Sequence, residues 1–68
     1  MNFEVIFRLR GKELARYQFP VETPVDFEAG VRYAIETFRI HKPEIDLLGD
    51  GMLMLIQKAG QNDAESTP

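Results

Sequence analysis

Residues 52–57 read Met-Leu-Met-Leu-Ile-Gln, so five successive positions of this segment are apolar. An extended strand turns successive side chains to opposite faces, and this segment would therefore present apolar side chains on both faces. Runs of this kind are typical of a central strand that is covered on both sides. The rest of the chain must supply two covers for the strand, or leave one face to another molecule.

The first 21 residues predict a hairpin of two strands. Residues 2–9 and 14–21 both alternate between apolar and polar positions, the period of a half-buried strand, and Ile6 interrupts the alternation in the first. Gly11 lies between them and can adopt the positive φ of a tight turn. The apolar positions that alternate are Phe3, Val5, Phe7, Leu9, Ala15, Tyr17, Phe19 and Val21.

The register of this hairpin follows from which side chains must share a face. A two-residue loop would set Phe7 opposite Arg16 and so mix charged side chains with core aromatics. A loop of three or five residues would set Phe7 opposite Tyr17. Burial therefore favours an odd loop, which a bulge at Gly11 would accommodate.

Residues 23–41 predict one amphipathic helix. Thr23 is a typical N-cap, Pro24 suits the first helical position, and Pro43 ends the helix after about His41. A glycine inside a helix costs about 1 kcal/mol relative to alanine, so Gly30 predicts a close approach of the helix to a neighbour such as the second strand. The apolar stripe comprises Phe27, Val31, Ala34, Ile35 and Phe38.

The order strand, strand, helix, strand predicts an α+β fold, a two-layer sandwich with one helix on a sheet of three or four strands. Residues 44–48 could be a turn of helix or a short fourth strand, and the last strand could run parallel or antiparallel to the first. We expect one compact domain over residues 1–58 and a polar, disordered tail over residues 59–68.

This order of elements resembles the start of the ubiquitin-like β-grasp fold over residues 1–58. The resemblance implies an accessory protein as one alternative. The C-terminal diglycine of ubiquitin-like and sulfur-carrier proteins is absent, because Ala59-Gly60 is followed by eight more residues.

One helix can cover only one face of a small sheet, so an apolar row is expected to remain exposed on the other face. Exposed apolar patches usually mark interfaces, and small domains without disulfides or metals often depend on association. We therefore expect a homodimer or a contact with another protein; alternatively, residues 43–48 or the tail fold back over this face. The predicted interface is Ile6, Leu14, Met52, Met54 and Ile56, with Leu53 and Leu55 as the alternative row of the last strand.

The basic residues are concentrated in the hairpin. Residues 1–20 hold four basic and two acidic side chains, a net charge of +2, within a chain of net charge −3. These basic residues could block edge-to-edge pairing, bind an acidic protein surface, or bind nucleic acid, which the acidic whole disfavours. They are Arg8, Arg10, Lys12 and Arg16, and Arg8 is expected opposite Arg16.

Few residues could carry chemistry. The chain has no cysteine, and His41, its single histidine, is expected at the helix C-terminus, where a cationic ring is favoured. The spacing of His41, Glu44, Asp46 and Asp50 matches no metal-binding motif. We therefore expect no enzyme, metal, cofactor, small-molecule substrate or membrane contact. We expect a protein-binding regulator, accessory subunit or inhibitor, in the cytoplasm because no signal peptide is evident.

Overall fold

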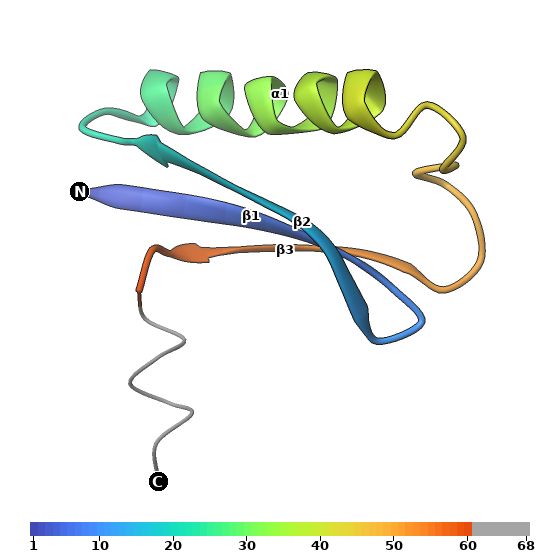
Figure 1. Cartoon of the computed structure of the whole chain (residues 1–68). Coiled ribbons are helices and arrows are strands. Elements are labelled where there is room, and N and C mark those ends of the chain that lie inside the picture. Colours follow the sequence, from blue (N-terminus) through green and yellow to red (C-terminus); the bar gives the residue numbers. More distant parts are fainter. Residues whose placement is uncertain (61–68) are drawn as a thin grey trace, which may run out of the picture.

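The computed structural model describes residues 1–60, and the tail predicted to be disordered lies outside the described residues from position 61 onward. The elements are β1 (Asn2–Leu9), β2 (Lys12–Pro20), α1 (Pro24–His41) and β3 (Met52–Lys58). The helix lies along one side of a three-stranded antiparallel sheet (Figure 1). The described residues therefore confirm the predicted α+β sandwich.

The strand order is β2-β1-β3, so β1 is central and β3 lies at an edge. The prediction that residues 52–57 form the central strand is wrong. The burial of β1 explains the order, because Val5, Ile6 and Phe7 are all buried and occupy both faces of that strand. The interruption at Ile6 was therefore the sign of a central strand. The direction of β3, which the sequence left open, is antiparallel to β1.

The hairpin turn is tighter than expected. Leu9 pairs with Lys12, so the loop has only two residues and the prediction of an odd loop is wrong. Arg10 and Gly11 both have positive φ, 51° and 84°, as in the two-residue turns that match the twist of the strands. The backbone N–H of Arg10 donates to the carbonyl of Gly51 at 2.9 Å, which ties this turn to the start of β3.

The extra residue expected in the turn lies instead in β2. Leu14 has no partner in the ladder, because the register shifts between the pair of Phe7 with Ala15 and the pairs nearer the turn. This β-bulge returns apolar residues of the two strands to one face. Burial was therefore the correct criterion, but the register differs, because Phe7 lies opposite Ala15 and not opposite Tyr17.

The helix has the predicted ends. The Thr23 hydroxyl accepts a hydrogen bond from the Asp26 N–H at 3.2 Å, and the Asp26 carboxylate accepts one from the Thr23 N–H at 3.2 Å. This capping box satisfies two backbone donors at the helix N-terminus. Pro24 is the first helical residue and His41 the last.

The core lies between α1, β1 and β2. The rings of Phe7 and Phe38 stack with their centroids 4.2 Å apart. Gly30 is buried, and a Cβ at this position would overlap the ring of Phe19 in β2, which confirms the predicted close approach. The buried core side chains are Val5, Phe7, Phe19, Ala34 and Phe38.

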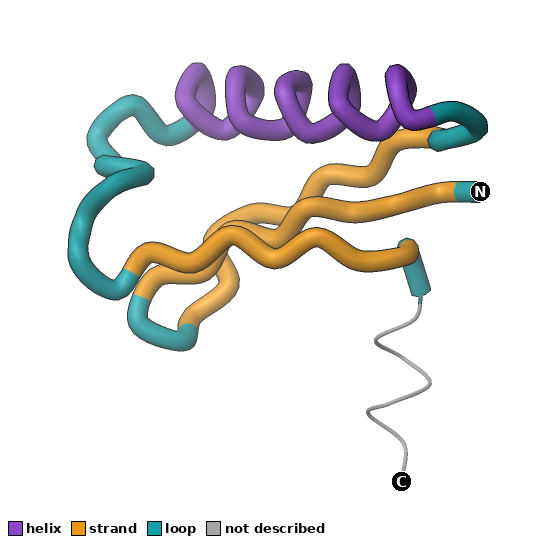
Figure 2. Tube along the Cα trace, turned by 180° about the vertical axis from the view of Figure 1, so that it is seen from behind, coloured by secondary structure: helices purple, strands orange, loops and turns teal. Residues whose placement is uncertain are grey.

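Residues 42–51 descend from the end of α1 to β3 along one end of the molecule (Figure 2). They form turns, so neither the helical turn nor the fourth strand that the sequence left open at 44–48 is present. The Asp46 carboxylate accepts a hydrogen bond from the Leu48 N–H at 2.9 Å, and this side-chain turn competes with regular structure. Ile45 and Leu47 pack against the core on the helix side, so this loop does not cover the opposite face.

Candidate functional site

The position of α1 over the sheet leaves β3 uncovered. Within the described part of the chain, α1 packs against β2 and β1 and makes no close backbone approach to β3. Figure 1 shows the end of β2 just beneath the helix, with β1 and β2 running away from the helix toward their turn. Because a helix is about 10 Å wide and strands lie about 4.8 Å apart, one helix covers about two strands. Because Gly30 of α1 lies against Phe19 of β2, the two strands that the helix covers are β2 and its neighbour β1.

Both side-chain rows of β3 are therefore partly exposed. Met52, Met54 and Ile56 lie beside core residues of β1, on the face that carries α1. Met54 is 40% exposed and Ile56 38%. We expected the helix to cover one row and leave the other, but it reaches neither fully, because β3 is an edge strand. These three predicted interface residues are partly open from the helix side.

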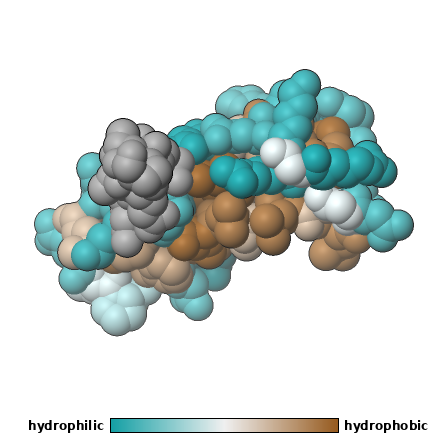
Figure 3. Space-filling model, turned by 90° about the horizontal axis from the view of Figure 1, so that it is seen from below, coloured by the Kyte–Doolittle hydropathy of each residue, from teal (hydrophilic) through white to brown (hydrophobic). Residues whose placement is uncertain are grey.

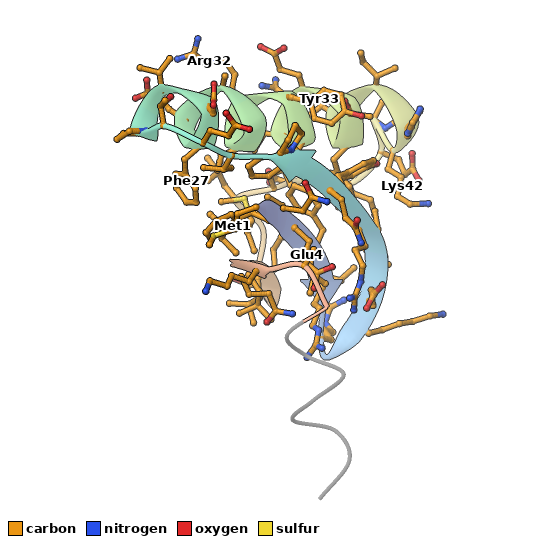
Figure 4. The ribbon with its side chains drawn as sticks, turned by 90° about the vertical axis from the view of Figure 1, so that its left-hand side faces the viewer. Met1, Glu4, Phe27, Arg32, Tyr33 and Lys42 are labelled. Atoms are coloured by element: carbon orange, nitrogen blue, oxygen red, sulfur yellow. The ribbon has the colours of Figure 1, made fainter. Side chains whose placement is uncertain are left out.

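A groove runs between α1 and β3, and we call it the α1–β3 groove. Its two hollows have volumes of about 810 and 840 Å³, and both are lined by Ile35 and Arg39, so they meet in the middle. Figure 4 shows Phe27 extending from α1 toward the sheet at one end. The loop residues Ile45 and Leu47 close the other end. The charged side chains of α1 that line the groove are Glu28, Arg32, Glu36 and Arg39.

The opposite face of the sheet is held together by a buried carboxylate. Glu4 of β1 is 0% exposed and lies away from α1 (Figure 4). Its carboxylate accepts hydrogen bonds from Arg16 Nη1 of β2 at 3.1 and 3.2 Å, and from Gln57 Nε2 of β3 at 2.7 Å. The three strands are thus linked through one acid, and its burial is matched by hydrogen bonds to both neighbours.

Two of the predicted interface residues take part in the chain's own packing, Ile6 as a buried residue and Leu14 as a partly buried one. Ile6 lies on the face opposite α1 but is only 1% exposed, because Arg16 and Leu55 flank it on the neighbouring strands. Leu14 packs against the core at the bulge. The exposed apolar residue of this face is instead Leu53, at 51%. Seen from this side, hydrophobic surface crosses the middle of the molecule between hydrophilic borders (Figure 3).

The four basic residues of the hairpin do not form one uniform patch. Arg8 lies opposite Glu13, and not opposite Arg16 as expected, because the bulge shifts the register. Arg16 binds both Glu4 and Glu13, the second at 2.9 Å. The hydrogen bond from Arg16 holds the pKa of Glu13 below its usual value, and the same bond raises the pKa of Arg16. Arg10 and Lys12 remain exposed near the turn.

Polar groups at the end of α1 form a small surface cluster. The Tyr17 hydroxyl lies 3.4 Å from Nδ1 of His41, and burial raises the pKa of Tyr17. Across residues 1–60, no three acidic, histidine or cysteine side chains come together in a group that could bind a metal. None of the described helices has the length and apolar character needed to cross a membrane.

The sequence pattern did not identify the helix side of the groove. Phe27, Val31 and Ile35 have the spacing of core residues, and they do pack partly on the core. Whether these residues also line a groove depends on how far α1 lies from β3. The spacing of apolar residues along the helix does not indicate that distance. No family model, no curated protein and no solved structure matches this chain.

Proposed function

We propose that this chain is a small, non-enzymatic protein-interaction module that binds through β3, using its edge and the α1–β3 groove. The observation that supports this most is the run of five apolar residues on an edge strand. Burying the exposed parts of Leu53, Met54 and Ile56 would contribute on the order of 2–3 kcal/mol. That is a large share of the stability of about 5 kcal/mol expected for so small a domain.

The two edges of the sheet differ in a way that favours this proposal. Natural edge strands carry bulges, charged residues or proline, which prevent pairing with other chains. The β2 edge has all three, with the bulge at Leu14, the charge of Lys12 and Pro20 at its end. The β3 edge is apolar from Met52 to Ile56, and its one charged residue is Lys58 at the end. One edge is protected and the other is suited to a partner.

A nucleic-acid-binding function is less favoured than protein binding. The carboxylates of Glu4 and Glu13 already bind Arg16, and both acids lie among the basic residues of the hairpin. A phosphate backbone would meet these acids as well as the bases. The cytoplasm is the compartment we expect, since small extracellular domains normally rely on disulfides and this chain has no cysteine.

Site-specific photocrosslinking in the native host tests the proposal. A photoreactive phenylalanine analogue at Met54 is expected to give a discrete adduct with a protein identified by mass spectrometry; an adduct with a second copy of the chain would have twice the mass of 7.8 kDa. The matched control places the same analogue at Ile40, an apolar residue of α1 that is 76% exposed. Equal crosslinking from both positions, or none from Met54, would contradict a binding role for β3.

A further inference from the structure

The direction of each backbone group at the β3 edge follows from two hydrogen bonds. The Ala59 N–H donates to the Asn2 carbonyl at 2.8 Å, and the Arg10 N–H donates to the Gly51 carbonyl at 2.9 Å. Backbone groups in an antiparallel strand alternate between its two sides. The odd-numbered residues of β3 therefore bond to β1, and the N–H and C=O groups of Met52, Met54, Ile56 and Lys58 point to the open edge.

The same alternation accounts for the protected edge. The Val21 N–H donates to the Met1 carbonyl at 2.7 Å, so the odd-numbered residues of β2 beyond the bulge bond to β1. The even-numbered residues point outward, and Pro20 occupies one of these positions without an unused N–H. On β3, every outward position carries a donor.

We propose that a second copy of this chain occupies the β3 edge through antiparallel pairing of β3 with β3, with Met54 on the two-fold axis. This inference rests on the proposed function, because it names the partner of the same surface. The two sheets would join into six continuous strands in the order β2-β1-β3-β3-β1-β2. The three outward residues Met52, Met54 and Ile56 of each copy would form about six backbone hydrogen bonds across the axis.

The residues of β3 are self-complementary in this register. Met54 lies opposite Met54 of the second copy, Met52 opposite Ile56, and Leu53 opposite Leu55, so every apolar residue faces another. Lys58 lies just beyond Met52 of the second copy, beside the turn that carries Asp50, which brings opposite charges near each other at each end of the pairing. A shift that sets Leu55 on the axis would instead place Lys58 opposite Met52. The opposed charges and the matched apolar residues therefore favour the register in which Met54 lies on the two-fold axis.

The two-fold axis has a consequence for the groove. Antiparallel strands of one sheet are related by an axis perpendicular to it, so both α1 helices lie on the same side of the joined sheet. The two α1–β3 grooves then face each other above the paired strands. The charged side chains along each rim are Glu28, Arg32, Glu36 and Arg39.

Engineered cysteines test the register, since the natural chain contains none. Directly opposed, hydrogen-bonded residues have Cα atoms about 5.5 Å apart, which a disulfide can bridge. The Met54→Cys protein is expected to form a covalent dimer on oxidation. Ile56→Cys is the control, because in this register the two copies of residue 56 lie four positions apart along the strand direction. Equal crosslinking of both variants, or more of Ile56→Cys, would overturn the register.

Proline substitution and amide exchange test the edge pairing itself. The matched control is Gln18→Pro, which changes an outward position of β2. In sedimentation at micromolar concentrations, we expect this variant and the wild-type chain to have a mass of twice 7.8 kDa. Met54→Pro is expected at the monomer mass with an unchanged circular dichroism spectrum. Should a proline variant unfold, exchange on the wild type decides, since the Met54 and Ile56 amides should exchange at least about tenfold more slowly than that of Gln18.

The outcomes separate the two proposals. A wild-type chain that stays monomeric, with amides at Met54 and Ile56 that exchange as fast as that of Gln18, refutes self-pairing. If Met54 nevertheless crosslinks to another identified protein in the host, the interaction function stands with a different partner. If neither self-association nor crosslinking from Met54 occurs, both proposals fail.

Discussion

Gly30→Ala is the sharpest test of how α1 sits on the sheet. Alanine is about 1 kcal/mol more favourable than glycine inside a helix, so propensity alone predicts a more stable protein. A Cβ at this position would overlap the ring of Phe19, which is only 6% exposed and cannot swing away freely. Overpacking of this kind costs about 1–3 kcal/mol or more. Because the overlap is severe, the cost lies at the upper end of this range, and Gly30→Ala is expected to lower the free energy of unfolding by about 2 kcal/mol.

A double-mutant cycle measured by urea denaturation isolates that contact. In a Phe19→Ala background the ring is gone, so Gly30→Ala should raise the free energy of unfolding by about 1 kcal/mol, as propensity predicts. Phe19→Ala itself costs about 3–5 kcal/mol, so all four proteins are compared in a stabilising osmolyte. Ala29→Gly, at the exposed neighbouring position, should cost about 1 kcal/mol in either background. If Gly30→Ala stabilises both backgrounds equally, α1 does not lie against Phe19.

Three further predictions concern the hydrogen bonds of the fold, all measured by chemical denaturation. Thr23→Ala removes the N-cap acceptor and is expected to cost about 1 kcal/mol, whereas an unchanged midpoint would contradict the capping box. Glu4→Ala removes the acceptor shared by Arg16 and Gln57 and is expected to lower the free energy of unfolding by about 1–3 kcal/mol. An unchanged free energy of unfolding would mean that water accepts the hydrogen bonds of these donors equally well. The pKa of Glu13 is lowered by its bond from Arg16, so its contribution is complete above the usual value of 4.5 and is lost as pH falls through the lowered pKa. Glu13→Gln should therefore lose less stability than the wild type between pH 7 and pH 3.

Features that depend on neighbours along the chain could be predicted from the sequence. The Thr23 cap and the end of α1 at His41 were predicted correctly, because caps and prolines act within one helical turn. The contact at Gly30 was predicted because a buried helical glycine needs a physical reason. The tight turn at Arg10 was missed, because burial required an extra residue somewhere and the pattern did not show that it lay in β2.

The candidate site could be predicted only in part. The apolar row of Met52, Met54 and Ile56 was predicted as an interface on the sheet face away from the helix, but the structure places it, partly exposed, on the face that carries α1. Ile6 was assigned to the same surface because one helix covers only one face of the sheet and leaves the other open. On the face without a helix, the side chains of both neighbouring strands shield a central strand. This shielding buries Ile6 although no helix covers that face.

The sequence by itself determined which segments are strands, where the helix begins and ends, and which residues are too apolar to remain in water. Only the tertiary structure decided which apolar strand is central and where the helix lies. Two segments, around Ile6 and around Met54, are apolar on both faces, and local periodicity treats them alike. The choice depends on contacts between distant residues, because Glu4 finds donors on both neighbouring strands and Gly30 admits Phe19. Those contacts put the helix over β2 and leave β3 at the edge.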